Sequence, residues 1–405
     1  MIYQLYDLQR AAWAPLGLAA AAARGMSRVL ATSFGDHQAH RAVDAACEFL
    51  DRSIRHPRTV AFDVKHALVA GNAVPVEERE VDRRPFCTLR HFARIAKRDD
   101  PKVLVVAPLS GHFSALLNDA VETLLQSHDV YLTDWSDARD VPVEDGAFSL
   151  DTYIAYLIDY VRLLGPDLHV VAFSQSTVPA LAAAALLAEA GGNEGPRSLT
   201  LVAGPIDARI EATPAQAFAA RQPRTWYETS VISNVPFGYA GAGRRVLPGF
   251  VQLAGYISHD FDRHLSAHWD FLGRLLAGDD DAASAHRRFY DRFFSVLDLT
   301  AEFFLDTLSN VFQKHTLARG TMRWRGTAVD TRALARPALL TIEGGADDVS
   351  APGQTTAAHS LCPNIPASRH AHFLEPDAGH LGLFYGHHWR EAVAPCIRDF
   401  IRANR

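Results

Sequence analysis

The chain has 405 residues, enough to bury a large hydrophobic core. Its 48% hydrophobic and 21% charged residues are typical of a soluble globular protein. A net charge of −6 lacks the basic excess of nucleic-acid-binding proteins, so no nucleic-acid partner is expected.

Residues 1–58 are predicted to form a helical segment. Residues 11–23 are apolar and alanine-rich, but Pro15 and Gly17 interrupt them. No stretch reaches the ~18 uncharged apolar residues that a transmembrane helix needs. A secretory signal requires a basic region before its apolar core, and residues 1–7 supply none. We therefore expect a cytoplasmic protein whose first helices pack on its body. The alternative is an amphipathic segment that docks onto a surface.

Apolar, β-branched stretches recur along the chain and predict about eight strands. They are residues 59–64, 86–92, 103–108, 130–134, 168–173, 199–203, 338–343 and 372–375. Helical patterns at 114–126, 150–164 and 178–190 separate several of them. Alternating strands and helices predict an α/β protein with a mostly parallel sheet covered on both faces. The first two strands have no helix between them, which suits an antiparallel start.

Residues 204–336 break this alternation. The interval is too long for a loop and carries helical, aromatic-rich patterns, so it predicts a helical cap inserted between strands 6 and 7. The core is then formed by residues 59–203 and 337–405. Trp226 and Tyr239 lie in stretches punctuated by proline and glycine, away from regular helices. We expect these two to line an apolar passage to the reacting group.

The most informative motif begins with the predicted strand at residues 168–173. It runs directly into Ser174 and then into an alanine- and leucine-rich helix. This is the layout of a nucleophile elbow, in which a sharp strand-to-helix turn exposes a serine hydroxyl. The turn needs small neighbours two residues away, and Ala172 and Ser176 are small. The N–H of Gln175 would point at the reacting oxygen.

Two alternatives stay open at this motif. Ser174 would also suit the N-cap of a helix without any chemistry. Ser176 is a competing nucleophile, but Val178 lies two residues after it, and a β-branched side chain fits a tight turn poorly.

A carboxylate follows the next strong strand pattern. Residues 337–343 are apolar and lead into a G-x-x-D sequence that ends at Asp347. The carboxyl edge of a parallel sheet is where such folds bind their ligands. Asp347 is therefore the candidate orienting acid, with Asp348 as the alternative.

A histidine follows the last strand pattern. His380 lies between Gly379 and Gly382, just after the predicted strand at 372–375. The order serine, acid, histidine along the chain is that of α/β-hydrolases. His380 would then be the general base for Ser174.

Acyl transfer also needs a second N–H donor for the developing oxyanion, opposite the N–H of Gln175. The loop after the third strand supplies it in this architecture. In this chain that loop is residues 108–113, in which Gly111 permits a close backbone approach. Leu109 and Ser110 are the candidates, and the sequence does not choose between them.

With these motifs in place, the chain resembles the intracellular poly(3-hydroxybutyrate) depolymerases, which are α/β-hydrolase relatives of the polyhydroxyalkanoate synthases. The similar segments are Met1-Ile-Tyr-Gln-Leu-Tyr-Asp-Leu-Gln-Arg, residues 107–113, residues 130–142, Trp324-Arg-Gly with Val329-Asp330, residues 343–355, and Gly379-His-Leu-Gly-Leu-Phe-Tyr-Gly. The resemblance spans nearly the whole chain.

The chain departs from this family at the elbow. The best-known members carry a cysteine in a V-C-Q-P-T context, whereas this chain has Phe-Ser-Gln-Ser-Thr at residues 173–177. By position, Ser174 takes the place of the cysteine, and Asp347 and His380 match the family's acid and base. A serine keeps the hydrolase mechanism available.

The resemblance implies an ester hydrolase that cleaves poly(3-hydroxybutyrate) or its oligomers and works in the cytoplasm, at the surface of polymer granules. No cofactor or metal is expected, since the scattered Cys47, Cys87, Cys362 and Cys396 lack metal-ligand spacing. The alternatives are a small-ester carboxylesterase and a non-catalytic granule-binding protein. Either the monomer or a homodimer is compatible with the sequence.

Overall fold

A computed structural model describes residues 2–34, 38–54, 60–95, 99–191, 194–259 and 261–405. The α-helices are α1 Ile2–Phe34, α2 Gln38–Ile54, α3 Asn118–Leu124, α4 Leu150–Leu164, α5 Thr177–Glu189, α6 Pro214–Arg221, α7 Arg224–Ser230, α8 Gly249–His259, α9 Phe261–Ala277, α10 Asp280–Phe293, α11 Ala301–Thr307, α12 Ala358–Leu361, α13 Gly386–His388 and α14 Ala394–Ala403. The main-sheet strands are β1 His66–Val69, β2 Asn72–Arg84, β3 Cys87–Arg94, β4 Lys102–Val106, β5 Asp129–Trp135, β6 Leu168–Phe173, β7 Ser198–Val202, β13 Ala338–Gly344 and β14 His370–Glu375.

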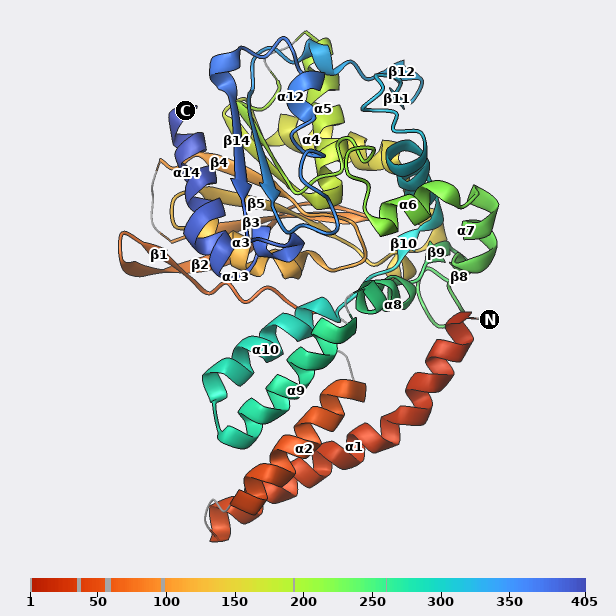
Figure 1. Ribbon diagram of the computed structural model, residues 1–405, viewed down its shortest axis with the longest axis vertical. Coiled ribbons are helices and arrows are strands. Elements are labelled where there is room, and N and C mark those ends of the chain that lie inside the picture. Colours follow the sequence, from red (N-terminus) through yellow and green to blue (C-terminus); the bar gives the residue numbers. More distant parts are fainter. Residues whose placement is uncertain (1, 35–37, 55–59, 96–98, 192–193, 260) are drawn as a thin grey trace.

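These nine strands form one sheet in the order β1-β2-β3-β5-β4-β6-β7-β13-β14. The six strands from β5 to β14 in this order run parallel, and β1, β2 and β3 pair antiparallel. The strands β4, β6, β7 and β13 are mostly apolar and, apart from Lys102, fully buried, because helices such as α4, α5 and α14 cover the sheet (Figure 1). The predicted α/β class with a mostly parallel sheet is confirmed.

The start of the sheet differs from the prediction. Residue 59 lies outside the described residues, and residues 60–65 form no strand. The first strands are instead the β1–β2 hairpin, whose turn residues Ala70 and Gly71 both have positive φ, at 50° and 83°. The sequence of β2 is rich in Glu and Arg, and its exposed charges pair with one another, as Arg79 does with Glu77. The charged, exposed part of β2 needs no apolar run, so it carried little strand signal in the sequence.

Residues 204–336 contain α6 to α11 and also short strands, which the sequence did not predict. These are β8 Ser233–Asn234, β9 Arg245–Leu247 and β10 Leu299–Thr300 in one small sheet, and β11 Arg323–Trp324 with β12 Thr327–Ala328 in another. The N-terminal helices α1 and α2 pack against each other, and α2 also packs on α9. The boundaries that we predicted between core, cap and N-terminal segment remain a proposal.

Candidate active site

Ser174 occupies a strained turn between β6 and α5. Its φ is +51°, a left-handed conformation that a residue other than glycine adopts only at a cost. The side chain of Ser176 supports the turn, since its Oγ accepts the N–H of Phe173 at 2.9 Å and lies 2.8 Å from the carbonyl oxygen of Val106. Thr177 donates its hydroxyl to the carbonyl oxygen of Ser174 at 2.8 Å. Among the described residues, the turn thus leaves the Ser174 hydroxyl without a bond to the elbow backbone, whereas the Ser176 hydroxyl makes hydrogen bonds that stabilise the backbone of the turn.

A chain of hydrogen bonds joins Ser174, His380 and Asp347. His380 Nε2 lies 2.9 Å from Ser174 Oγ, and His380 Nδ1 lies 2.8 Å from Asp347 Oδ2. The other oxygen of Asp347 accepts the N–H groups of Val349 at 2.9 Å and Ser350 at 2.8 Å. The Asp347 side chain is fully buried, so its carboxylate is held in one orientation. The neighbouring residue Asp348 is exposed.

Two glycines let the segments that carry Asp347 and His380 approach each other. A Cβ on Gly344 would lie 2.3 Å from the carbonyl oxygen of Ala378, and one on Gly345 would lie 2.2 Å from that of Pro376. Any larger residue would push the 376–380 turn away from the end of β13. The close packing of these turns explains why the G-G-A-D sequence follows this strand.

The loop at residues 108–113 is held from two sides. On the elbow side, the N–H of Leu109 donates to Oε1 of Gln175 at 3.1 Å. On the cap side, Tyr256 of α8 donates its hydroxyl to the carbonyl oxygen of Ser110 at 2.6 Å, and the N–H of Leu297 donates to Gly111 at 2.9 Å. The contact with Tyr256 was not predictable from the sequence, because an aromatic residue in an apolar helix usually packs in a hydrophobic core.

The Gln175 side chain has a further unusual feature. Its Nε2 is buried and has no hydrogen-bond partner in the described part of the chain. A buried amide N–H without an acceptor is costly unless an arriving group accepts it. The side-chain amide of Gln175, the residue after Ser174, can therefore still donate a hydrogen bond through Nε2.

His112 borders this loop as a buried residue. Its ring contacts Tyr256 and Phe293, each with centroids 5.1 Å apart. Burial lowers the pKa of His112 to about 4, so the ring is neutral near pH 7. A neutral ring in this position suits packing between the loop and the cap.

Trp226 and Tyr239 lie in separate packing clusters. Trp226 is part of α7, contrary to the expectation that it lies outside a regular helix, and its ring contacts Phe218 and Tyr227. Pro223 is the N-cap residue of this helix, whereas a proline at this position in the sequence predicts that no regular helix is present. The Tyr239 ring contacts Tyr3 of α1. These contacts do not involve Ser174 or His380, so the wall role of both residues stays a prediction.

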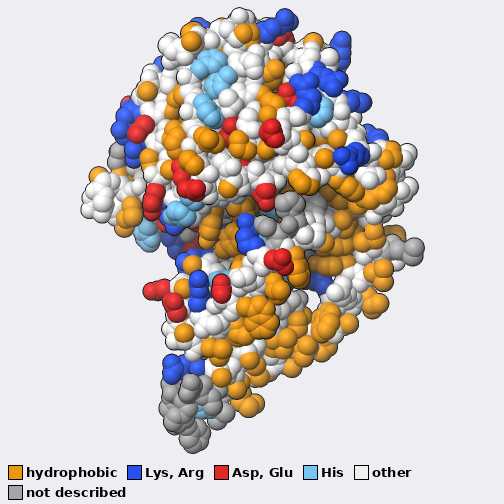
Figure 2. Space-filling model, viewed as in Figure 1, with side chains coloured by type: hydrophobic (Ala, Val, Ile, Leu, Met, Phe, Trp, Pro, Cys, Tyr) orange, Lys and Arg blue, Asp and Glu red, His pale blue; other side chains and the backbone are white. Residues whose placement is uncertain are grey.

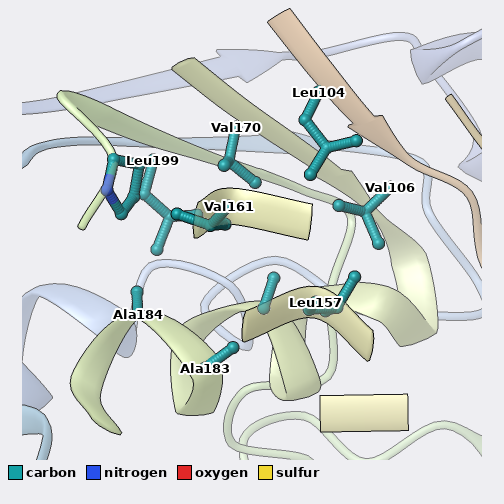
Figure 3. A pocket seen from close by; sticks show the side chains of 10 residues that line it. Leu104, Val106, Leu157, Val161, Val170, Ala183, Ala184 and Leu199 are labelled. Carbon is teal, nitrogen blue, oxygen red and sulfur yellow. The ribbon is translucent and has the colours of Figure 1, made fainter. Parts of the chain in front are cut away.

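An internal cavity lies between the sheet and helices α4 and α5, and its lining, including Leu104, Val106, Leu157 and Val170, is apolar (Figure 3). In the described ranges no three His, Cys, Asp or Glu side chains are grouped to hold a metal ion. No helix of the described residues has the length and apolar character to cross a membrane.

Residues 203–405, half of the chain, match the family described as PHB de-polymerase C-terminus. The chain belongs to this family. The matched residues include Asp347 and His380, and Ser174 lies before them. No curated protein matches the chain.

Solved structures that are similar to this chain at low sequence identity include two lipases and one hypothetical protein. A putative lipase from Acinetobacter baumannii AYE has 15% identity, covers 82% of this chain and 93% of its own, and has a TM-score of 0.41. A monoacylglycerol lipase from Paleococcus ferrophilus has 12% identity over 76% of this chain and 98% of its own, with a TM-score of 0.44. The hypothetical protein PA2218 from Pseudomonas aeruginosa has 14% identity over 87% and 99%, with a TM-score of 0.46.

Proposed function

We propose that this protein hydrolyses the ester bonds of poly(3-hydroxybutyrate) or its oligomers through an acyl-enzyme on Ser174. The observation that carries the proposal is the hydrogen-bonded chain from Ser174 through His380 to Asp347, with spacings of 2.9 and 2.8 Å. A serine, a histidine and a buried carboxylate in this arrangement are the working parts of acyl transfer. Membership of the depolymerase family supports a polyester as the acyl donor.

The first half of the reaction forms the acyl-enzyme. His380 Nε2 takes the proton of Ser174 as Oγ attacks the ester carbonyl carbon, and a tetrahedral oxyanion forms. Asp347 orients the imidazole and stabilises its protonated form. When the intermediate collapses, His380 gives the proton to the departing hydroxyl end of the polymer. The remaining 3-hydroxyacyl group stays on Ser174.

The second half releases the acid. His380 removes a proton from a water molecule, which attacks the acyl carbonyl, and the proton returns to Ser174 Oγ as the carboxylic acid leaves. The N–H of Gln175, at the start of the helical turn 174–176, and an N–H of Leu109 or Ser110 are the proposed oxyanion donors. Each step uses only side chains, backbone N–H groups and water, so the mechanism requires no cofactor.

The same proposal gives roles to larger parts of the chain. Residues 59–203 and 337–405 form the hydrolase core, residues 204–336 the cap, and residues 1–58 an N-terminal helical segment. Trp226 and Tyr239 are proposed wall residues for long substrates. The proposed place of action is the surface of polyester granules in the cytoplasm.

The test compares three substrates for the purified protein: amorphous poly(3-hydroxybutyrate) particles, crystalline polymer and p-nitrophenyl butyrate. We expect hydrolysis of the amorphous particles, and labelling by an active-site fluorophosphonate that disappears in Ser174→Ala. Turnover of p-nitrophenyl butyrate alone would identify a small-ester carboxylesterase instead. Particle binding without labelling or turnover would identify a non-catalytic granule protein.

A further inference from the structure

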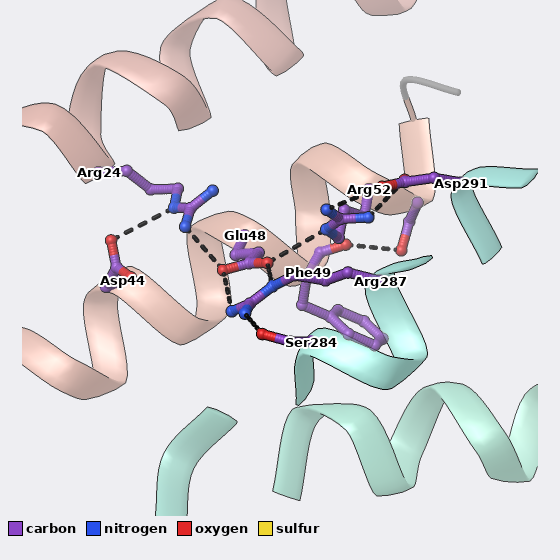
Figure 4. Close-up of polar contacts among 9 residues, drawn as sticks. Arg24, Asp44, Glu48, Phe49, Arg52, Ser284, Arg287 and Asp291 are labelled. Carbon is purple, nitrogen blue, oxygen red and sulfur yellow. Dashed lines mark hydrogen bonds and ion pairs between the residues drawn. The ribbon is translucent and has the colours of Figure 1, made fainter. Parts of the chain in front are cut away.

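Buried polar networks outside the candidate site join different parts of the chain. Helices α1, α2, α9 and α10 form an arm that projects from the sheet (Figure 1), and hydrophobic side chains gather over the arm on the face seen in Figure 2. Inside the arm, Glu48 of α2 is buried among three arginines, which include Arg24 of α1 and Arg287 of α10 (Figure 4). These bonds join helices of the arm to one another. A different buried network joins α6 to the loop that carries Asp347.

The centre of this second network is a reciprocal pair of side-chain amides. Gln216 Nε2 of α6 donates to Oε1 of Gln354 at 2.9 Å, and Gln354 Nε2 donates to Oε1 of Gln216 at 2.8 Å. Gln216 Nε2 also donates to the carbonyl oxygen of Val349 at 2.9 Å. Gln354 Nε2 also donates to the carbonyl oxygen of Ile210 at 2.9 Å. Both hydrogens of each Nε2 are therefore used, and turning either amide over would place its oxygen against a carbonyl oxygen. Both side chains are buried, so the pair is held in this one arrangement.

The bond from Gln216 reaches Asp347 through a single peptide group. The C=O of Val349 and the N–H of Ser350 belong to the same planar, trans peptide unit, so they point in opposite directions. The C=O end accepts Gln216 Nε2, and the N–H end donates to Oδ1 of Asp347 at 2.8 Å. A planar unit cannot turn at one end without turning at the other. Gln216 therefore fixes the direction of a bond to Asp347, whose other oxygen lies 2.8 Å from Nδ1 of His380.

The two ends of the loop after β13 are held by different parts of the chain. At the far end, Glu343 of β13 accepts three N–H groups at 2.7 to 2.9 Å, those of Gly353, Thr355 and Thr356. At the near end, the hydroxyl of Ser350 donates to Oε1 of Gln354 at 3.3 Å, beside the bond from Gln216 to Val349. The Val349 side chain is 41% exposed, so its packing does little to hold the peptide unit. The amide pair is what restrains this end of the loop.

Gln216 has a second role at the start of α6. Its Oε1 accepts the N–H of Thr213 at 3.1 Å, and its own N–H donates to the hydroxyl oxygen of Thr213 at 3.3 Å, which is a capping box. The box uses the oxygen and the backbone of Gln216, whereas the bond to Val349 uses Nε2. The two roles can therefore be separated, because a change at Thr213 weakens the helix start and leaves the Nε2 bonds in place.

We propose that Gln216 is a positioning residue for Asp347. Through the peptide unit of residues 349 and 350, it holds the carboxylate in the orientation that directs His380 towards Ser174. The proposal rests on the hydrolytic function proposed above. Without the bond from Gln216, the peptide unit is free to rotate, and the carboxylate can turn with it. A displacement of about 1 Å that originates away from the reacting atoms can cost on the order of 100-fold in rate.

The test is a double-mutant cycle of Gln216→Met and Asp347→Ala. It measures kcat and KM for p-nitrophenyl butyrate, and also the rate at which a fluorophosphonate labels Ser174, which needs no turnover. Gln216→Met alone should lower kcat and the labelling rate by at least about tenfold, with little change in KM. In the Asp347→Ala background the same change should have less than about a twofold effect, because no carboxylate is left to position.

The matched control is Thr213→Ala, which breaks the capping box from its other side. It should lower the melting temperature and leave kcat unchanged. Losses that multiply in the double variant, or an equal loss of kcat in Thr213→Ala, would overturn the proposal. If Gln216→Met does not fold, Gln216→Glu takes its place at alkaline pH. Its ionised carboxylate still accepts the N–H of Thr213 and donates nothing to Val349.

The outcomes also separate this proposal from the proposed function. Turnover of p-nitrophenyl butyrate that follows the expected cycle, without hydrolysis of polyester, would retain the positioning role and reject the polyester substrate. Multiplying losses in a protein that hydrolyses polyester would reject the positioning role alone. An original protein that shows neither turnover nor labelling would reject both.

Discussion

Leu109 donates its backbone N–H to the side-chain oxygen of Gln175 across 3.1 Å. This bond joins the 108–113 loop to the residue that follows Ser174, so the two proposed sources of oxyanion donors are tied together before any substrate arrives. The bond also places Oε1 of Gln175 against the N–H of Leu109, which is one of the proposed donors to the oxyanion of the substrate. A negative charge on this side chain should therefore oppose the oxyanion directly.

We expect Gln175→Glu to lower kcat/KM for p-nitrophenyl butyrate by at least about 100-fold. Two unit charges about 4 Å apart repel by about 4 kcal/mol at an effective dielectric constant of 20. The loss should shrink at acidic pH, where the new carboxyl group is protonated. Gln175→Met, which is similar in size and uncharged, is the control and should lose much less. Equal losses in the two variants would show that this side chain lies away from the oxyanion.

Ser174→Ala should abolish turnover while leaving the far-UV circular dichroism spectrum unchanged. The loss should be several orders of magnitude, since the three groups act as a unit. Ser176→Ala should retain most of the activity and lower the melting temperature, because the Ser176 hydroxyl supports the elbow backbone. The opposite pair of results would assign the nucleophile to Ser176.

Asp347→Asn should cost far more in kcat than Asp348→Asn. Only Asp347 lies 2.8 Å from His380 Nδ1, and a neutral amide there favours the wrong tautomer of the imidazole. The corresponding loss in serine proteases is on the order of 10⁴-fold. Steady-state kinetics on a soluble ester measure both variants. Similar losses at the two positions would contradict the assignment of the acid.

Stability should fall as the pH drops from about 6.5 to about 4. Burial lowers the pKa of His112, His128 and His169 to about 4 in the folded protein. In this window the unfolded chain binds protons that the folded chain does not, so the free energy of unfolding decreases with falling pH. Each such group contributes a loss of about 2 kcal/mol between pH 7.5 and pH 5, so the three predict a loss on the order of 6 kcal/mol, measurable by urea denaturation. His128→Asn should reduce this pH dependence, whereas an unchanged slope would contradict the role of His128.

The elements and site residues that the sequence predicted correctly share one property. Each could be recognised from a local hydrophobic pattern or from its position directly after a strand. β6 and α4 begin and end as predicted because a continuous apolar run and an amphipathic period each identify one buried element. Ser174, Asp347 and His380 were grouped because each follows a strand of a parallel sheet, and such strands end at the same edge. The structure joins these three by hydrogen bonds, and their catalytic roles remain predictions.

Other features depended on contacts between residues distant in sequence. The charged strand β2 exists because it pairs with β1 and β3, and its own residues carry no apolar alternation. The bond between Tyr256 and Ser110 joins residues 146 positions apart, and it depends on how helix α8 lies against the loop at residues 108–113. Trp226 lies in α7, which starts directly after Pro223, and its ring packs against Phe218 and Tyr227.

The sequence by itself therefore determined the mostly parallel α/β sheet and the order of the candidate catalytic residues, because the periodicity of a strand or helix and the order of residues can be read from the sequence without any tertiary contact. Only the tertiary structure decided which side of α1 is exposed to solvent. Apolar residues occur all around this helix, and the sequence alone does not show which of them are buried. The contacts of Arg24 with Glu48 and of Tyr3 with Asp298 turn one half inward and leave Leu8 and Met26 facing the surroundings.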